Sequence, residues 1–173
     1  FSDSTMQYFI IALLVALGAP TRGYTSCGDD AVRVYKGTSS YSSDAICNVG
    51  DGRVYRKTSS YSSDIICNIR GDRIYEKNSS YSSDVLYTVK DGKVYRGNSS
   101  YSSDVLFNIS GGKMYSGNSS YSSDIICNIR NNKVYEGSSS YSSDVLFNFD
   151  GPLSLIEFVA VWHAVKYGWQ ADD

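Results

Sequence analysis

The chain has 173 residues, with 16 basic and 18 acidic side chains and a net charge of −2. A balance this close to neutral excludes the basic surface that nucleic acid binding requires, so we expect no nucleic-acid partner. The length is that of one domain. The 16 tyrosines and the recurring β-branched residues predict short strands joined by tight turns.

An apolar run opens the chain, and every residue from 8 to 17 is apolar. The run is too short to span a bilayer, so we expect no membrane span. Its length is typical of a signal peptide, and a buried helix that caps the fold is the alternative. We treat residues 1–23 as this N-terminal apolar segment. A signal peptide would make the protein secreted or displayed on the cell surface; the alternative location is cytoplasmic.

A block of twenty residues then occurs six times without insertion or deletion, over residues 33–152. Residues 24–32 form a degenerate partial repeat before it, since Cys27 lies twenty residues before Cys47. Repeats of this period indicate an array in which each unit buries its apolar face against its neighbours. The six copies start at Arg33, Arg53, Arg73, Lys93, Lys113 and Lys133.

One hexapeptide, Ser-Ser-Tyr-Ser-Ser-Asp, is unchanged in all six copies. In the first copy it occupies residues 39–44, and five residues before its tyrosine the sequence varies freely, as Lys36 and its equivalent Glu76 illustrate. Six adjacent polar positions are therefore held either by contacts that every copy repeats or by a ligand that every copy meets.

The apolar run of each copy alternates, as a strand does. In the fourth copy Val105, Phe107 and Ile109 point one way, and Leu106 and Asn108 point the other. The Phe107 position accepts Cys, Tyr or Phe, so we expect it to be partly exposed, whereas the Leu106 position is always Ile or Leu and suits a packed core. We expect the Asn column to bond along the stack. Pairs such as Asp51-Gly52 and Asn131-Asn132 predict two-residue turns with positive φ.

Two all-β architectures fit this block. In the first, each copy is one coil of a β-solenoid and like residues stack in columns, which the strict period and the Tyr, Ser and Asn columns favour. In the second, each copy is a β-hairpin and the hairpins wind into a superhelix, which the basic residue at the head of every copy favours, because a column of like charges is unfavourable. We favour the solenoid of six coils.

The Gly-Lys-Val-Tyr pattern at twenty-residue spacing, as at residues 92–95, resembles choline-binding and glucan-binding cell-wall repeats. The resemblance covers the six copies alone. Those families place tryptophans in aromatic cages, whereas both tryptophans of this chain, Trp162 and Trp169, lie after the copies.

A helix is predicted after the repeats, within residues 153–168. Ser154 and Glu157 form a capping box at its start, and Gly168 stops it after Tyr167. Its broad apolar stripe predicts a lid on the last copy, because an array with an open end exposes its core. Residues 169–173 form a short tail.

No pattern in the chain indicates catalysis. The single histidine, His163, lies on the predicted helix, and no base accompanies the repeated serines, so we expect no enzyme activity, no catalytic residue and no cofactor. The four cysteines show no metal-binding spacing, so we expect no metal site. Cys47 is within disulfide range of Cys27 or Cys67 if neighbouring coils stack, although an apolar thiol is the simpler interpretation.

The leading interpretation is a repeat protein that binds a glycan or a protein partner through tyrosine and serine columns. A scaffold whose columns only hold the coils together is the alternative, and an ice-binding array of hydroxyls is the third. End-to-end or lateral self-association is a further expectation. The candidate binding face consists of Tyr41, Tyr61, Tyr81, Tyr101, Tyr121 and Tyr141 together with Tyr55, Tyr75, Tyr95 and Tyr115.

Overall fold

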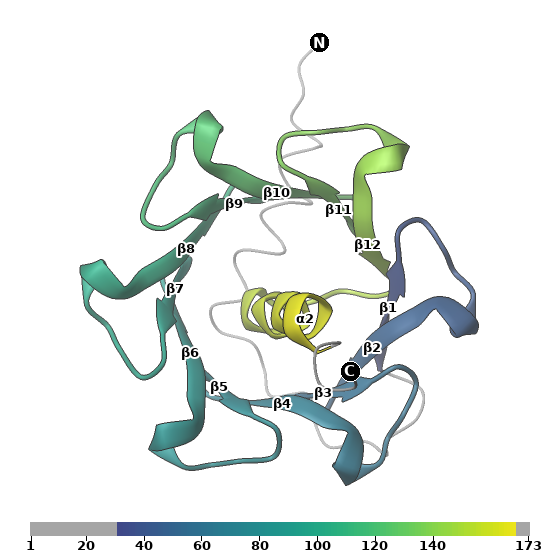
Figure 1. The fold of residues 1–173 in the computed structure, drawn as a ribbon, viewed down its shortest axis with the longest axis horizontal. Coiled ribbons are helices and arrows are strands. Elements are labelled where there is room, and N and C mark those ends of the chain that lie inside the picture. Colours follow the sequence, from purple (N-terminus) through teal and green to yellow (C-terminus); the bar gives the residue numbers. More distant parts are fainter. Residues whose placement is uncertain (1–30, 169–173) are drawn as a thin grey trace.

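The computed structural model describes residues 31–168. Twelve antiparallel strands close into one barrel, and a single described α-helix lies inside the ring of strands (Figure 1). The strands are β1 (Val32–Lys36), β2 (Ala45–Gly50), β3 (Arg53–Arg56), β4 (Ile65–Arg70), β5 (Arg73–Glu76), β6 (Val85–Lys90), β7 (Lys93–Arg96), β8 (Val105–Ser110), β9 (Lys113–Ser116), β10 (Ile125–Arg130), β11 (Lys133–Glu136) and β12 (Val145–Phe149). The helix is α2 (Leu155–Tyr167).

Both predicted architectures, the β-solenoid and the open superhelix of hairpins, are therefore wrong. The copies do not form an open array, because the first strand pairs with the last: Tyr35 on β1 lies opposite Asn148 on β12. The same pairing joins Tyr55 to Asn48 between β3 and β2, so the contact that closes the ring repeats the register used inside it. Asp150 completes the junction by accepting a hydrogen bond from the Arg33 amide at 2.7 Å.

Each copy supplies one short strand, one long strand and two different connections. A two-residue turn joins each long strand to the next short strand, and at Asp51 and Gly52 φ is 52° and 69°. Positive φ at both positions was predicted, and it is present in four of the five turns; at Gly71-Asp72 only Gly71 has positive φ. Between each short strand and the following long strand the register shifts, as at Val54/Tyr55. Such a bulge adds twist and bend to the sheet, and its repetition in every copy curves the sheet into a ring.

The other connections are six outer loops, which project outward from the ring in Figure 1. Each begins at a residue with positive φ, which is glycine in four loops and Lys57 or Lys77 in the other two. Each ends in a short 3-10 helix, as at Ser42–Asp44. The outer loops are residues 37–44, 57–64, 77–84, 97–104, 117–124 and 137–144.

An asparagine on five of the six long strands holds the outer loop of the next copy, and on β6 Thr88 takes this role by donating to the Gly97 carbonyl at 2.8 Å. Asn68 donates two hydrogen bonds of 2.8 Å, to the carbonyl oxygens of Lys77 and Ser79. Asn148 makes the same pair across the closure, to Gly37 and Ser39. From the sequence we expected the asparagines to bond to one another along a stack. This expectation is wrong, because they bond to the backbone of the outer loops.

The helix is as predicted in its limits but not in its position. Ser154 accepts a hydrogen bond from the Glu157 amide, and Glu157 accepts one from the Ser154 amide, which confirms the capping box. The helix is enclosed by the ring, packs chiefly against β2 and β4, and buries every residue from Phe158 to Trp162. Because these five residues are apolar around the whole circumference of the helix, this part of α2 is buried on all sides. The helix therefore fills the barrel, and the prediction that it forms a lid on the last copy is wrong.

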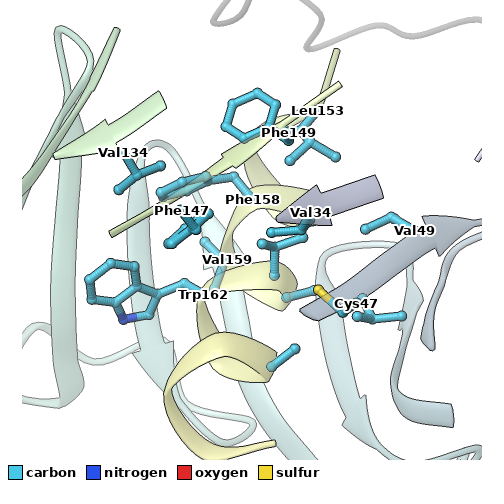
Figure 2. Close-up of a cluster of buried hydrophobic side chains, with 14 of the residues drawn as sticks. Val34, Cys47, Val49, Val134, Phe147, Phe149, Leu153, Phe158, Val159 and Trp162 are labelled. Carbon is cyan, nitrogen blue, oxygen red and sulfur yellow. The ribbon is translucent and has the colours of Figure 1, made fainter. Parts of the chain in front are cut away.

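The row that accepts Cys, Tyr or Phe faces this helix. The expectation that the row is partly exposed is confirmed for Tyr87 and Phe107 alone and is wrong for its other four residues. Cys47, Cys67, Cys127 and Phe147 are fully buried. Phe147 lies beside Phe158 and Trp162, with ring centroids 6.4 and 6.3 Å apart (Figure 2). Small side chains stand on β2 and β4, where the helix is close, whereas Phe147 reaches the helix from β12; Cys127 on β10 does not follow this pattern.

The strand asparagines that hold the outer loops act as clamps, and removing one should destabilise the fold in proportion to the number of hydrogen bonds lost. Asn68→Ala removes two bonds from a buried side chain, so we expect unfolding to become easier by about 2 kcal/mol. Asn108→Ala removes a single bond, to Ser119, and should cost about 1 kcal/mol. Urea unfolding measures the stability of both variants, and equal losses would contradict the assignment of two hydrogen bonds to Asn68 and one to Asn108.

Two phenylalanines in the same row give a test of the helix position. Phe147→Ala empties a fully buried site against α2 and should cost about 4 kcal/mol. Phe107→Ala truncates a half-buried ring, so we expect a loss of about 2 kcal/mol. Thermal or urea unfolding compares the two variants, and a larger loss at Phe107 would overturn the described packing.

Candidate functional site

The outer loops carry the invariant hexapeptide, and part of it is needed to build the loop. Ser79 donates from its hydroxyl to an Asp84 carboxylate oxygen at 2.5 Å and accepts from the Tyr81 amide at 3.2 Å. The Asp84 amide donates to the Tyr81 carbonyl at 3.0 Å. The same three bonds recur in all six loops, so the first serine and the aspartate of each hexapeptide have a structural reason to be invariant.

Two of the loop carboxylates, those of Asp84 and Asp144, are stabilised in their charged form. Hydrogen bonds from Ser79 and then from Ser83 lower the pKa of Asp84, and Ser139 and Ser143 lower that of Asp144 in the same way. These carboxylates are therefore ionised at neutral pH and engaged with the loop itself.

The tyrosine at the tip of each loop is exposed. Tyr41 and its five equivalents are each 74–75% exposed. The serines on either side, Ser40 and Ser42 in the first loop, are exposed as well. Within residues 31–168, no hydrogen bond uses the side chains of these three residues or of their equivalents. Their invariance among the copies has no counterpart in the contacts that hold the fold.

The second tyrosine column is in a different environment. Tyr55 and Tyr75 are 8% exposed, and Tyr95 and Tyr115 are half-buried. At the closure, Tyr35 donates from its hydroxyl to Asp150 at 3.3 Å. The structure therefore separates the ten predicted site tyrosines: the loop-tip column is open to solvent, and the strand column is largely packed into the barrel wall.

The loop tips carry no net charge of their own. In the first loop Thr38, Ser40, Tyr41 and Ser42 are exposed and neutral, and the carboxylate of Asp44 is engaged by Ser39 at 2.6 Å. Each tip therefore offers one aromatic ring with hydroxyl groups beside it. That combination provides an apolar stacking surface and polar anchors at the same place.

A polar cluster inside the barrel was not predicted as a site from the sequence. The Tyr87 hydroxyl lies 3.0 Å from Nδ1 of His163, and the two rings meet edge to face. The ring of Tyr167 lies 5.3 Å from that of His163. The signal in the sequence was Tyr87 itself, which is the one tyrosine in a row of Cys and Phe, and it faces the single histidine of the chain.

The cysteines of the barrel are buried free thiols. Cys47 and Cys67, which we considered as a disulfide pair, are both unbonded, and Cys27 lies outside the described residues. Burial raises the pKa of Cys67 and of Cys127 to about 12, so both stay protonated at neutral pH. The structure places them as apolar packing groups.

Residues 31–168 hold neither a cluster of metal ligands nor a membrane-spanning helix. No three side chains of His, Cys, Asp or Glu come together as metal ligands in this part of the chain. Over the same range no helix is long and apolar enough to cross a membrane.

The model of one protein family, described as the 6-fold beta flower protein, matches residues 34–162. The chain belongs to this family. The matched residues begin in β1 and end in α2, so this 6-fold beta flower spans nearly all of the barrel and most of the helix. The resemblance to choline-binding repeats is not confirmed. No curated protein and no solved structure matches the chain.

The two tyrosine columns should respond differently to truncation. Tyr101→Ala and Tyr121→Ala remove side chains that are 75% exposed, so we expect the free energy of unfolding to change by no more than about 0.5 kcal/mol. Tyr55→Ala removes a buried ring and should cost about 3 kcal/mol. Chemical unfolding of the three variants checks this, and a large loss at Tyr101 would mean that the loop tips support the fold.

Proposed function

We propose that this 6-fold beta flower is a non-enzymatic binding protein that recognises neutral glycans through its six loop tips. The observation that carries the proposal is the repeated exposure of an invariant tyrosine and its flanking serines, which no contact in the described structure requires. A selected ligand contact would account for that invariance.

The chemistry of the tips favours a neutral, hydroxyl-rich ligand. A tyrosine ring can stack on the apolar face of a sugar while neighbouring serine hydroxyls exchange hydrogen bonds with the sugar's own. An anionic ligand would favour cations at the tips, and those of the first loop, Thr38 to Ser43, carry none. A protein partner with a polar surface remains compatible with the same groups and is the second outcome of the test.

The ring arrangement favours a ligand that repeats. Six tips project around one rigid barrel (Figure 1). A single tyrosine contact is weak, but binding at one tip raises the effective concentration of the ligand at the next, which adds avidity without any new type of contact. The proposal therefore includes a multivalent target, such as a polysaccharide or a cell surface, and a secreted or surface location.

A scaffold role is the competing proposal, and the buried tyrosine column favours it. Tyr55 and Tyr75 are packed, and a strand side chain, asparagine in five copies and Thr88 in the other, holds every loop. In that case the exposed tips have no ligand. The ice-binding interpretation is not carried into the proposal, because the serine hexapeptides lie on six separate loops that project outward around the ring (Figure 1).

Glycan-array binding tests the proposal. The full chain should bind neutral polysaccharides; a single Tyr101→Ala change should weaken binding about tenfold, and replacement of all six tip tyrosines should abolish it. The variants should unfold like the parent, because the tips are exposed.

Tyr55→Phe is the matched control, since it alters the buried column and leaves every tip intact. A six-tyrosine variant that binds glycans like the parent would contradict the proposal. A folded parent that binds no glycan but is captured by a polar protein surface through the tips would favour the protein partner, and no binding of either kind would favour the scaffold.

A further inference from the structure

Basic side chains of the barrel wall are concentrated at one of its two ends. The two-residue turns lie at this end, called the turn end, and each joins the last residue of a long strand to the first residue of the next short strand. The first residue of every copy is Arg or Lys, and three long strands also end in a cation. Together these cations form the basic belt, which consists of the first residues of the six copies and of Arg70, Lys90 and Arg130.

The barrel wall has fewer carboxylates than cations at the turn end. Four carboxylates stand beside the nine cations of the belt, those of Asp51, Asp72, Asp91 and Asp150. The aspartate of each outer loop lies at the opposite end, directly before the start of a long strand, as Asp44 does before β2. The near-neutral charge of the whole chain therefore conceals a positive end.

The belt lies on the outside of the barrel. Along β11 the fully buried Val134 belongs to the core around the helix (Figure 2), so Lys133 and Tyr135 on either side of it point outward. The guanidinium carbon of Arg130 lies 5.9 Å from the centre of the Tyr135 ring, which places Arg130 on the same outer face. Every residue of the belt is at least partly exposed to solvent.

The strand register places cations of the belt directly opposite one another. The pairs are Arg70 with Arg73, Lys90 with Lys93, and Arg130 with Lys133. Like charges directly opposite each other destabilise an antiparallel sheet. The belt is therefore retained in spite of an unfavourable contribution to the fold, which indicates a role other than stability.

Internal ion pairs do not account for the belt either. Between residues of the range 31–168 the belt makes one salt bridge, from Arg73 to Asp72 at 3.9 Å. Lys113 and Lys133 follow turns made of glycine or asparagine, which offer no carboxylate. Arg and Lys replace each other at the first position of the copies, although their hydrogen-bonding geometries differ. The sign of the charge is thus what the six copies share at this position.

The cations of the belt lie at one level around the barrel. The junction that closes the ring pairs Tyr35 with Asn148 in the register that pairs Tyr55 with Asn48 inside it. Equivalent residues of the six copies are therefore related by rotation about the barrel axis without a step along it. A flat, negatively charged surface can approach all of these cations together.

We propose that the basic belt docks the turn end of the barrel onto a bilayer surface rich in anionic lipids. Such a surface attracts Lys and Arg through its negative potential and needs no fixed ligand geometry, which fits the exchange of Arg and Lys among the copies. The outer loops project sideways from the ring (Figure 1), so their tips stay free when this end faces the bilayer. The inference does not depend on glycan binding by those tips.

Vesicle co-sedimentation of the full chain tests the docking. Vesicles with an anionic lipid, phosphatidylserine in phosphatidylcholine, should bind at least about a hundredfold more tightly than phosphatidylcholine alone. Raising the salt from about 0.15 M to about 1 M should remove this preference, because the Debye length falls from about 8 Å to about 3 Å. The double change Lys113→Gln with Lys133→Gln should weaken binding about thirtyfold, since each cation near an anionic bilayer contributes about fivefold.

Lys57→Gln with Lys77→Gln is the matched control, because it removes the same charge from the start of two outer loops, at the opposite end of the barrel. This control should bind vesicles like the parent, as should Lys113→Arg with Lys133→Arg, which keeps the charge. Urea unfolding of the Lys113→Gln, Lys133→Gln variant should show no loss of stability, because Lys133 stands opposite Arg130.

Three results would overturn the proposal: no preference of the parent for anionic vesicles, equal weakening in the two double Gln variants, or tighter binding to duplex DNA than to the vesicles at the same salt. Replacement of the six tip tyrosines should leave vesicle binding unchanged, because the tips lie away from the belt. Failure of the docking and failure of glycan binding are therefore separate results.

Discussion

The width of the barrel is the constraint on which the rest of the structure depends. Eight strands enclose an interior that side chains alone can fill, and twelve strands enclose a wider one. Helix α2 fills the additional interior space of the twelve-stranded barrel, which explains why its residues from Phe158 to Trp162 are all apolar. It also accounts for the small cysteines on β2 and β4 and the larger Phe147 on β12, although not for Cys127 on β10.

Local features of the fold could be predicted from the sequence, whereas its closure could not. The repeat unit, the turn at Asp51-Gly52 and the Ser154 capping box depend on neighbouring residues, and all are present. A stack, a superhelix and a ring make similar contacts between successive copies. They differ in whether the first copy meets the last, which here depends on the pairing of Tyr35 with Asn148 over more than a hundred residues. The unbroken apolar run of the helix was the overlooked indication that it is surrounded on all sides.

The candidate site was predictable in one column and not in the other. Tyr41 and Tyr55 each belong to a column of tyrosines that recurs every twenty residues, and composition alone does not distinguish the two columns. The bulge beside Tyr55 and its packing bury one ring, and the Ser39–Asp44 hydrogen bond presents the other to solvent. Comparing copies shows that a position is constrained, but three-dimensional contacts are needed to separate constraint by folding from constraint by a ligand.

Closure of the ring has an evolutionary consequence. Linear repeat proteins gain or lose units easily, because each unit meets only its neighbours and the ends are free. In this protein the Asn148 clamp joins the last copy to the first loop, so an added or deleted copy would change the circumference of the barrel. The helix would then no longer fit the space it fills. The number of copies and the size of α2 are therefore coupled, so gaining or losing a single twenty-residue unit would disturb the packing inside the barrel.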